Sequence, residues 1–312
     1  MTGLPLKPPP ANEESAAGYM LRLLAANGAS LRELRANRSV TSSDLSSQLA
    51  SLAGVAPEWF RHRLPTALIS DGWLEVEIFG MRWREPWLLR GTRHQVCAAC
   101  LSERGFASRA WDLIAYPACH IHHVVLQDRC IRCGGAIRDD RPALAVCSCG
   151  AVLGYADAES VPAAPDVVAW CARMASALEL EFHCASADPF GFERWFGGTS
   201  PDGAYRLVLA FAGGDQAFRH ALIASQRSWL PSSAAHDLIH RGLDGLRRTT
   251  PRPSSERQAI VDALAEQQLA GITHWDRAIA GKELSRLALR PRRRLDGSRA
   301  ASQLSLFDPE RP

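Results

Sequence analysis

The sequence contains almost no lysine. Lys7 and Lys282 are the only lysines among 36 basic residues, so arginine carries nearly all of the positive charge. Arginine forms paired hydrogen bonds with phosphate groups, which would suit a nucleic-acid partner. A net charge of only +3 is nevertheless too small to indicate such a partner. A coding bias towards arginine and alanine explains the same composition, so the charge balance leaves the partner open.

Long hydrophobic runs are also absent. No apolar stretch approaches the roughly 20 residues that a membrane-spanning helix needs. The segment from Met1 to Asn12 is rich in proline and does not resemble a charged and then apolar signal segment. We therefore expect a cytoplasmic protein without a membrane anchor. The 312 residues, 46% of them hydrophobic, are enough for two or three small domains with a substantial core.

Motifs of several common catalytic sites are missing too. There is no G-x-x-x-x-G-K-[ST] phosphate-binding loop, because Gly281 and Lys282 have no matching glycine upstream. Neither H-E-x-x-H nor G-x-S-x-G occurs. These absences favour a protein that is not an enzyme.

Cysteine, in contrast, is frequent and regularly placed. Disulfide bonds are rare in a reducing cytoplasm, and nine cysteines cannot all pair with one another. Close pairs of cysteine or histidine are typical of tetrahedral zinc sites, whereas a thioredoxin-like redox motif has a single pair beside a βαβ unit. The pattern predicts two zinc ions, one held by three cysteines and a histidine and the other by four cysteines: Cys97, Cys100, Cys119, His122, Cys130, Cys133, Cys147 and Cys149.

The choice of histidine rests on spacing. His122 lies three residues after Cys119, which matches the other turns, whereas His120 directly follows Cys119 and would chelate badly. His123 stays an alternative ligand, and Cys171 lies on the apolar face of a predicted helix. Sequential sites are favoured, and an interleaved arrangement remains open. Four protein ligands leave no free coordination position, so both zinc ions are predicted to be structural.

The N-terminal region, residues 1–92, is predicted to be helical. Ser15 is a suitable cap for a helix that ends at Gly28. Further on, "SSDLSSQLASLAGVAPEWFRHRL" reads as a helix that ends at Gly54 and a second helix that begins at Pro57, the succession of a helix-turn-helix. A packing or dimerisation unit is the alternative. In a DNA-binding unit, the contacts would come from Arg61, His62 and Arg63.

The rest of the chain divides into three parts. A double zinc-binding module is predicted at 93–155, a helical domain at 156–290 and a disordered basic tail at 291–312, which makes the fold mainly α. Arginines at the start of the tail are candidate phosphate contacts: Arg290, Arg292, Arg293 and Arg294. Near the end of the chain, "QLSLF" is similar to the bacterial sliding-clamp-binding motif, in which the contacts would come from Gln303, Leu304, Leu306 and Phe307. The alternative is a segment that folds back on the protein's own core.

Residues 3–150 resemble the TniQ family of transposition proteins. The resemblance rests on "LPLKPPPANEESAAGYMLRLLAANG", on the helix-turn-helix succession, and on "CAACLSERGFASRAWDLIAYPACHIHHVVLQDRC" followed by "CIRCGG". It includes Trp111, between the first cysteine pair and the C-x-x-H, and Leu126 after it. Ala98 and His120 depart from the pattern, because the family often has proline at both positions.

The resemblance implies a function and a set of partners. TniQ proteins are accessory factors that select target DNA and work with a separate transposase and a separate AAA+ ATPase. Some relatives join an RNA-guided CRISPR effector, and some form homodimers. We therefore predict a non-catalytic target-selection adaptor that also binds the sliding clamp through its tail. The alternative is a stand-alone zinc-containing helix-turn-helix regulator, and a zinc-water enzyme would need an open coordination position.

Overall fold

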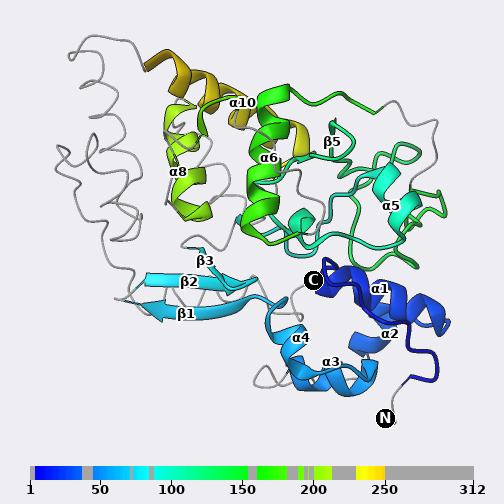
Figure 1. The fold of residues 1–312 in the computed structure, drawn as a ribbon. Helices are drawn as coiled ribbons and strands as arrows, with labels where there is room; N and C mark the ends of the chain where they lie inside the picture. The colour runs from blue at the N-terminus through cyan, green and yellow to red at the C-terminus, as the bar shows by residue number, and fades with distance from the viewer. Residues whose placement is uncertain are drawn as a thin grey trace.

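The structure is a computed structural model of the chain. It describes residues 4–36, 45–70, 73–83, 88–153, 160–180, 189–192, 196, 200–212 and 230–249. The helices are α1 (Ala16–Ala26), α2 (Leu31–Ala36), α3 (Leu45–Ala53), α4 (Pro57–Arg61), α5 (Ala98–Arg104), α6 (Pro165–Ala177), α8 (Pro201–Phe211) and α10 (Ser232–Thr249), with a 3-10 turn at Arg109–Asp112. Helices make up most of the regular structure in these ranges (Figure 1), in agreement with the mainly α prediction. Within the same ranges, no helix combines the length and the apolar character that crossing a bilayer requires.

Helix α1 begins and ends where the sequence indicated. The Ser15 hydroxyl accepts a hydrogen bond from the backbone N–H of Gly18 at 3.0 Å, which satisfies one of the free donors of the first turn. Gly28 follows the helix with a φ of +64°, a conformation that glycine adopts at little cost. The apolar face of α1 packs against α3 and α4, with the Tyr19 ring 5.0 Å from Trp59.

Helices α3 and α4 contact each other across the predicted tight turn. Gly54 has a φ of +71° and ends α3, and Pro57 occupies the first turn of α4. Helix α4 has only 5 residues, and its Phe60 side chain is buried in the cluster with α1. The helix, turn and helix are therefore present, but the second helix is short and one of its faces is used for packing.

A three-stranded antiparallel sheet follows α4, which the sequence interpretation missed. Strand β1 (Thr66–Ser70) pairs with β2 (Trp73–Ile78), and β2 pairs with β3 (Met81–Trp83). Phe79 and Gly80 connect β2 to β3 with φ values of +56° and +72°, the signature of a two-residue hairpin turn. The sequence does contain features that could have predicted the sheet: the glycine-containing dipeptides Asp71-Gly72 and Phe79-Gly80 are typical of hairpin turns.

One hydrophobic cluster extends through most of the described chain. It includes Val76 and Trp83 from the sheet, the cysteine-rich segment, and the inner faces of α6, α8 and α10. The Trp170 indole on α6 donates a hydrogen bond to the Ala115 carbonyl at 2.8 Å. Residues from the predicted N-terminal, zinc-binding and helical regions therefore share one core, and the domain boundaries stay a prediction.

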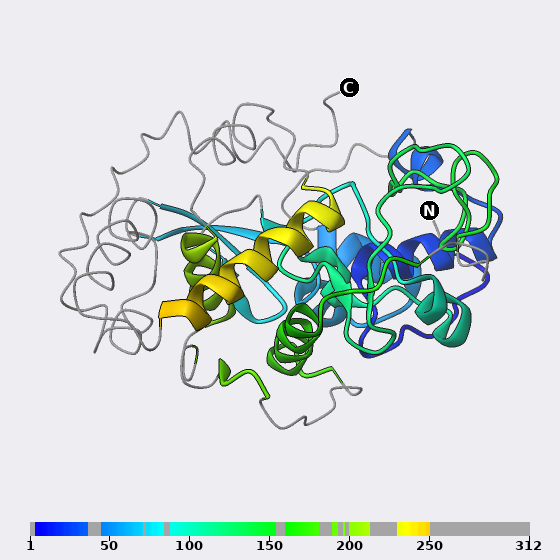
Figure 2. The ribbon, with the colours of Figure 1, turned by 90° about the horizontal axis from the view of Figure 1, so that it is seen from above.

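Helix α10 lies across the other C-terminal helices. Seen from above, it runs over α8 and towards α6 (Figure 2). Gly242 and Gly245 make this close approach possible, because a Cβ atom on Gly242 would lie 2.2 Å from the Val208 carbonyl oxygen of α8. The first residue of α10, Ser232, is held at the cysteine-rich segment.

A buried polar network holds Ser232 in place. Its backbone N–H donates to the Asp128 carboxylate at 2.7 Å, and its hydroxyl donates to the Gln95 side-chain oxygen at 2.8 Å. Arg90 donates to the same hydroxyl at 3.1 Å and lies 3.6 Å from Asp128. Burial lowers the pKa of Arg90 to about 10, so it remains charged at neutral pH. The network therefore joins α10 to the segment that carries the cysteines.

Candidate metal centres

The first cluster is assembled by helix α5 and the hairpin that follows it. Cys97 is the N-cap of α5, and Cys100 lies one turn further on. Cys119 ends the short strand β4 (Ala118–Cys119), which pairs with β5 (Val124–Val125), and His122 lies in the turn between the two strands. The His122 Nδ1 atom is 3.4 Å from the sulfur of Cys97, 3.2 Å from that of Cys100 and 3.5 Å from that of Cys119.

The second cluster consists of two facing turns. The sulfurs of Cys130 and Cys149 are 3.8 Å apart, as are those of Cys133 and Cys147. Gly134 and Gly150 follow these turns with φ values of +68° and +82°. This backbone conformation is strained for residues with a side chain, which explains the glycine after each pair.

Backbone pairing places the two clusters next to each other. Val96 and Gln127 exchange two hydrogen bonds of 2.8 Å, so the chain before Cys97 runs beside the chain before Cys130. The four potential ligand atoms of each cluster lie within 4.8 Å of one another. The first four predicted ligands thus form one cluster and the last four form the other, which is the sequential arrangement.

The geometry fits zinc. With a Zn–S distance of about 2.3 Å, the edge of a tetrahedron of sulfurs is about 3.8 Å long. The 3.6 Å between Cys100 and Cys119 and the 3.8 Å sulfur separations in the second cluster are close to that value. The eight described cysteines are all free thiols. Sulfur-rich sets of three or four cysteines select zinc or similar soft cations over calcium or magnesium.

The thiols in each cluster influence one another's ionisation. Hydrogen bonds from Cys100 and Cys97 lower the pKa of Cys119, and the same contact raises the pKa of Cys100. In the second cluster, a backbone hydrogen bond from Ala151 lowers the pKa of Cys149 to about 7. Each cluster thus contains a thiol with a lowered pKa, Cys119 or Cys149, beside a thiol with a raised pKa, Cys100 or Cys147. Metal binding is therefore expected to release protons.

Cys171 and the two histidines beside His122, His120 and His123, make other contacts in the structure. His120 Nδ1 is hydrogen-bonded to the Tyr116 hydroxyl, and its ring is buried. His123 is exposed and has a φ of +56°, and its N–H donates to the Cys119 carbonyl at 2.9 Å, which closes the turn around His122. Cys171 is fully buried on α6, in agreement with its prediction as a core residue.

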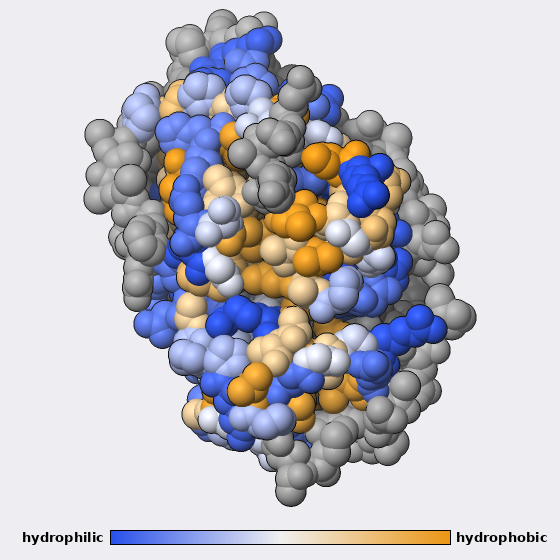
Figure 3. All heavy atoms as spheres, turned by 90° about the vertical axis from the view of Figure 1, so that its right-hand side faces the viewer, coloured by the Kyte–Doolittle hydropathy of each residue, from blue (hydrophilic) through white to orange (hydrophobic). Residues whose placement is uncertain are grey.

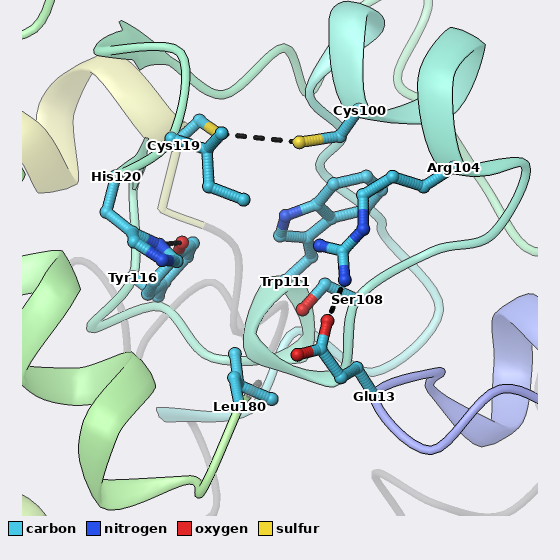
Figure 4. A pocket seen from close by; sticks show the side chains of 10 residues that line it. Glu13, Cys100, Arg104, Ser108, Trp111, Tyr116, Cys119, His120 and Leu180 are labelled. Carbon is cyan, nitrogen blue, oxygen red and sulfur yellow. Dashed lines mark hydrogen bonds and ion pairs between the residues drawn. The ribbon is translucent and has the colours of Figure 1, made fainter. Parts of the chain in front are cut away.

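The segment before α1 packs directly against the first cluster. Glu13 forms an ion pair with Arg104 of α5, and Glu14 accepts two hydrogen bonds from Arg22, at 2.6 Å and 3.0 Å. The Glu13–Arg104 pair closes a small pocket whose opposite side is formed by Cys100 and Cys119 (Figure 4). The Glu-Glu-Ser sequence thus has a physical explanation: two carboxylates anchor the segment, and the serine caps the helix.

The two clusters differ in exposure. Cys97, Cys100 and Cys119 are at most 2% exposed, whereas Cys133 and Cys149 of the second cluster lie at the surface. Chelators reach a metal more easily through exposed ligands. We therefore expect a chelator to remove the metal from the zinc-loaded chain in two phases, the second cluster first.

The two phases are measured with a zinc-indicator dye after excess chelator is added. Cys149→Ser is expected to abolish the fast phase and to leave the slow one. Ser148→Ala, a neighbouring exposed change that removes no sulfur, is the control and should retain both phases. A single phase that is insensitive to Cys149→Ser would contradict this assignment.

The predicted DNA-contact residues lie in two different environments. Arg61 and His62 are exposed, and Arg61 pairs with Glu58 at 3.2 Å. Arg63 instead turns inwards: it donates to the carbonyls of Asn12, Glu14 and Trp59 at 2.6–3.1 Å. Burial lowers the pKa of Arg63 to about 10. The structure therefore uses Arg63 to hold the N-terminal segment in place. The tail residues 290–294 and 303–307 lie outside the described residues.

Hydrophobic side chains gather on the face that carries α1 and α5. Figure 3 shows them in the middle of this face, framed by hydrophilic residues. In the cysteine-rich segment, exposed large apolar side chains include Ile121, Ile131 and Val152, at 37%, 64% and 50% exposure. Exposed apolar groups of this kind are typical of protein-binding surfaces.

The fold and the two clusters define a helical protein whose centre contains two groups of four cysteine and histidine side chains that could each hold a metal ion. The TniQ family model matches residues 5–126, so this part of the chain is similar to the TniQ family. The match begins in the proline-rich N-terminal segment and ends after the first cluster, and it confirms the resemblance. No curated protein matches the chain. This match supports a transposition-associated accessory protein.

Proposed function

We propose that this protein is a non-catalytic target-selection adaptor of DNA transposition, which recruits a transposase and an AAA+ ATPase to target DNA. The observation that carries the proposal is the TniQ match over residues 5–126, which includes the first cluster and the Glu-Glu-Ser segment docked on it. A protein of this kind needs surfaces for several macromolecules on one rigid scaffold.

The scaffold would be held by two zinc ions. Cys97, Cys100, Cys119 and His122 would bind the first ion, and the second would bind the four cysteines at 130, 133, 147 and 149. Each ion would have four protein ligands, so zinc would supply cross-linking and not an activated water. The helical parts pack onto this segment from both sides of the sequence. Metal binding would therefore hold α1 and α10 in their relative positions.

The partner surfaces lie around the scaffold. Arg61 and His62, at the exposed end of α4, would contact DNA phosphates. Arg290 and the arginines at 292–294 would add a salt-dependent contribution. The exposed apolar residues of the cysteine-rich segment would bind a protein partner, which fits recruitment. Gln303, Leu304, Leu306 and Phe307 would bind the sliding clamp and direct insertion to replicating DNA.

The test is an affinity purification of the tagged full chain from its own host, with bound proteins identified by mass spectrometry. Recovery of a transposase or an AAA+ ATPase supports the adaptor. A clamp signal that disappears in the Leu306→Ala, Phe307→Ala double variant, and persists in the Ser302→Ala control, supports the role of the tail. Subunits of an RNA-guided CRISPR effector would identify that route instead, and self-association would indicate a homodimer.

One result would reject the adaptor. If no transposition protein is recovered and the purified chain binds one DNA sequence tightly without a partner, the protein is a stand-alone regulator. The same purified chain, measured for zinc content, tests the metal assignment separately. About two zinc ions per chain are expected from two closed sites.

A further inference from the structure

A carboxylate outside the first cluster is aimed at its histidine. Glu103 lies on α5, three residues after Cys100, so the two side chains project from the same face of the helix. The two carboxylate oxygens of Glu103 are 3.0 Å and 3.1 Å from the Nε2 atom of His122. Helix α5 therefore presents a ligand sulfur of the cluster and, one turn later, a partner for another ligand.

The geometry assigns the two nitrogens of the His122 ring. Nδ1 faces the sulfurs of Cys97, Cys100 and Cys119 at 3.2–3.5 Å, whereas Nε2 faces Glu103. A neutral imidazole carries one proton, and a carboxylate accepts a hydrogen bond from the nitrogen that bears it. Nε2 therefore holds the proton, and the lone pair of Nδ1 is directed at the centre of the cluster.

His122 needs such a partner more than the cysteines do. The three sulfur ligands are buried among core residues, but the His122 side chain is 20% exposed at the edge of the cluster. Core packing fixes the cysteines, whereas a histidine at the surface can rotate about its side-chain torsions. A hydrogen bond to Nε2 restricts this rotation and makes Nδ1 a stronger electron donor.

We infer that Glu103 is a positioning residue of the first metal centre, which orients His122 for the metal through its Nε2–H. The inference rests on the proposed metal site at Cys97, Cys100, Cys119 and His122. Loss of a carboxylate partner of a ligating histidine typically lowers metal affinity about 10- to 100-fold. We therefore expect Glu103→Ala to weaken zinc binding at the first centre by about that factor and to leave the second centre unchanged.

If Glu103 contributed only to folding, its replacement would not change metal affinity at the first centre. Glu103 is 59% exposed, and an exposed ion pair on a helix surface contributes little to folding. Alanine has a slightly better helix propensity than glutamate, so Glu103→Ala does not weaken α5. If the contact with His122 had no effect on metal binding, Glu103→Ala would leave the zinc affinity of both centres unchanged.

The experiment uses the full chain loaded with cadmium, whose NMR signal differs between sulfur-only and mixed sulfur–nitrogen ligand sets. The two centres are then observed separately while a chelator of known affinity is added. Wild type, Glu103→Ala and Glu103→Gln are compared, with Ser102→Ala as a control on the exposed side of the same helix. A zinc competition with the same chelator gives the affinities for zinc.

The expected order of affinity at the first centre is wild type, then Glu103→Gln, then Glu103→Ala. Glutamine keeps an oxygen that accepts the Nε2–H bond but lacks the negative charge, so it restores part of the affinity. Equal affinities in all three proteins would overturn the role of Glu103 while leaving the metal site intact. A wild-type chain without a mixed sulfur–nitrogen signal would overturn the metal site itself, and with it this inference.

Discussion

Replacing Cys119 with serine is expected to release the metal from the first centre and to unfold the part of the chain built around it. Cys119 is 1% exposed and ends the strand that brings His122 to the cluster. A structural zinc ion contributes on the order of 10 kcal/mol of apparent binding free energy. That is as large as the entire net stability of a typical domain, roughly 5–15 kcal/mol. A buried serine hydroxyl cannot replace a thiolate ligand.

The measurement combines zinc content by elemental analysis with thermal unfolding. We expect Cys119→Ser to hold about one zinc ion in place of two, and to lose protection from proteases around residues 93–126. The control is Cys171→Ala, which removes an equally buried thiol outside both clusters and should retain both ions. If Cys119→Ser retained both ions and unfolded at the wild-type temperature, the first centre would be wrongly assigned.

Replacing Asp128 with alanine is expected to destabilise the protein by about 3–5 kcal/mol, because it leaves the buried Arg90 without its counter-ion. Arg90 is 4% exposed, and Asp128 also accepts the first backbone N–H of α10, from Ser232. The change therefore removes a charge partner and a helix anchor at once. Helix α10 is expected to lose its attachment to the cysteine-rich segment before the rest of the protein unfolds.

Hydrogen exchange of the zinc-loaded chain tests whether α10 detaches, because it reports the protection of individual backbone amides. Protection is expected to fall in the first turn of α10, and the melting temperature is expected to fall with it. Asp140→Ala is the matched control: Asp140 pairs with Arg138 at 3.6 Å on the surface, and exposed pairs contribute about 0–1 kcal/mol. If Asp128→Ala behaved like Asp140→Ala, the buried network would not be what holds α10.

Replacing both partners of this ion pair gives a further check. Arg90→Met combined with Asp128→Leu removes both charges and retains side-chain volume, so it is expected to be more stable than Asp128→Ala. If the double variant recovers the stability that Asp128→Ala loses, the unpaired charge of Arg90 causes that loss. If the stability is not recovered, the hydrogen bond from Ser232 to Asp128 contributes more to stability than the charge pair does.

The two cysteine-rich clusters were predictable because the sequence pattern that marks them is local. A pair of ligands two or three residues apart forms one turn, and the glycines at 134 and 150 mark the backbone conformation that such a turn requires. The helices at residues 16–26 and 165–177 were predictable for the same reason: each has a cap or a proline at its start and an apolar face. The sheet formed by β1, β2 and β3 was missed because short strands carry weaker patterns, although the sequence contains two glycine-containing dipeptides between the strands.

Other features depend on residues that are distant in the sequence. Whether Arg63 faces DNA or the protein's own N-terminal segment is decided by the fold, since its partners Asn12 and Glu14 are about fifty residues away. The pairing of Glu103 with His122 depends on how α5 lies against the hairpin. The attachment of α10 through Asp128 joins residues 104 positions apart.

The sequence by itself predicted eight candidate metal ligands, with His123 as an alternative, and a resemblance of the N-terminal part to the TniQ family. Spacing carries this information, because the ligands within each pair must fit one turn. The tertiary structure alone decided how the pairs combine, that Arg61 is exposed whereas Arg63 faces inwards, and that Glu103 contacts His122. These are contacts between segments that meet only when the core forms, and their physical cause is burial and charge pairing between distant parts of the described chain.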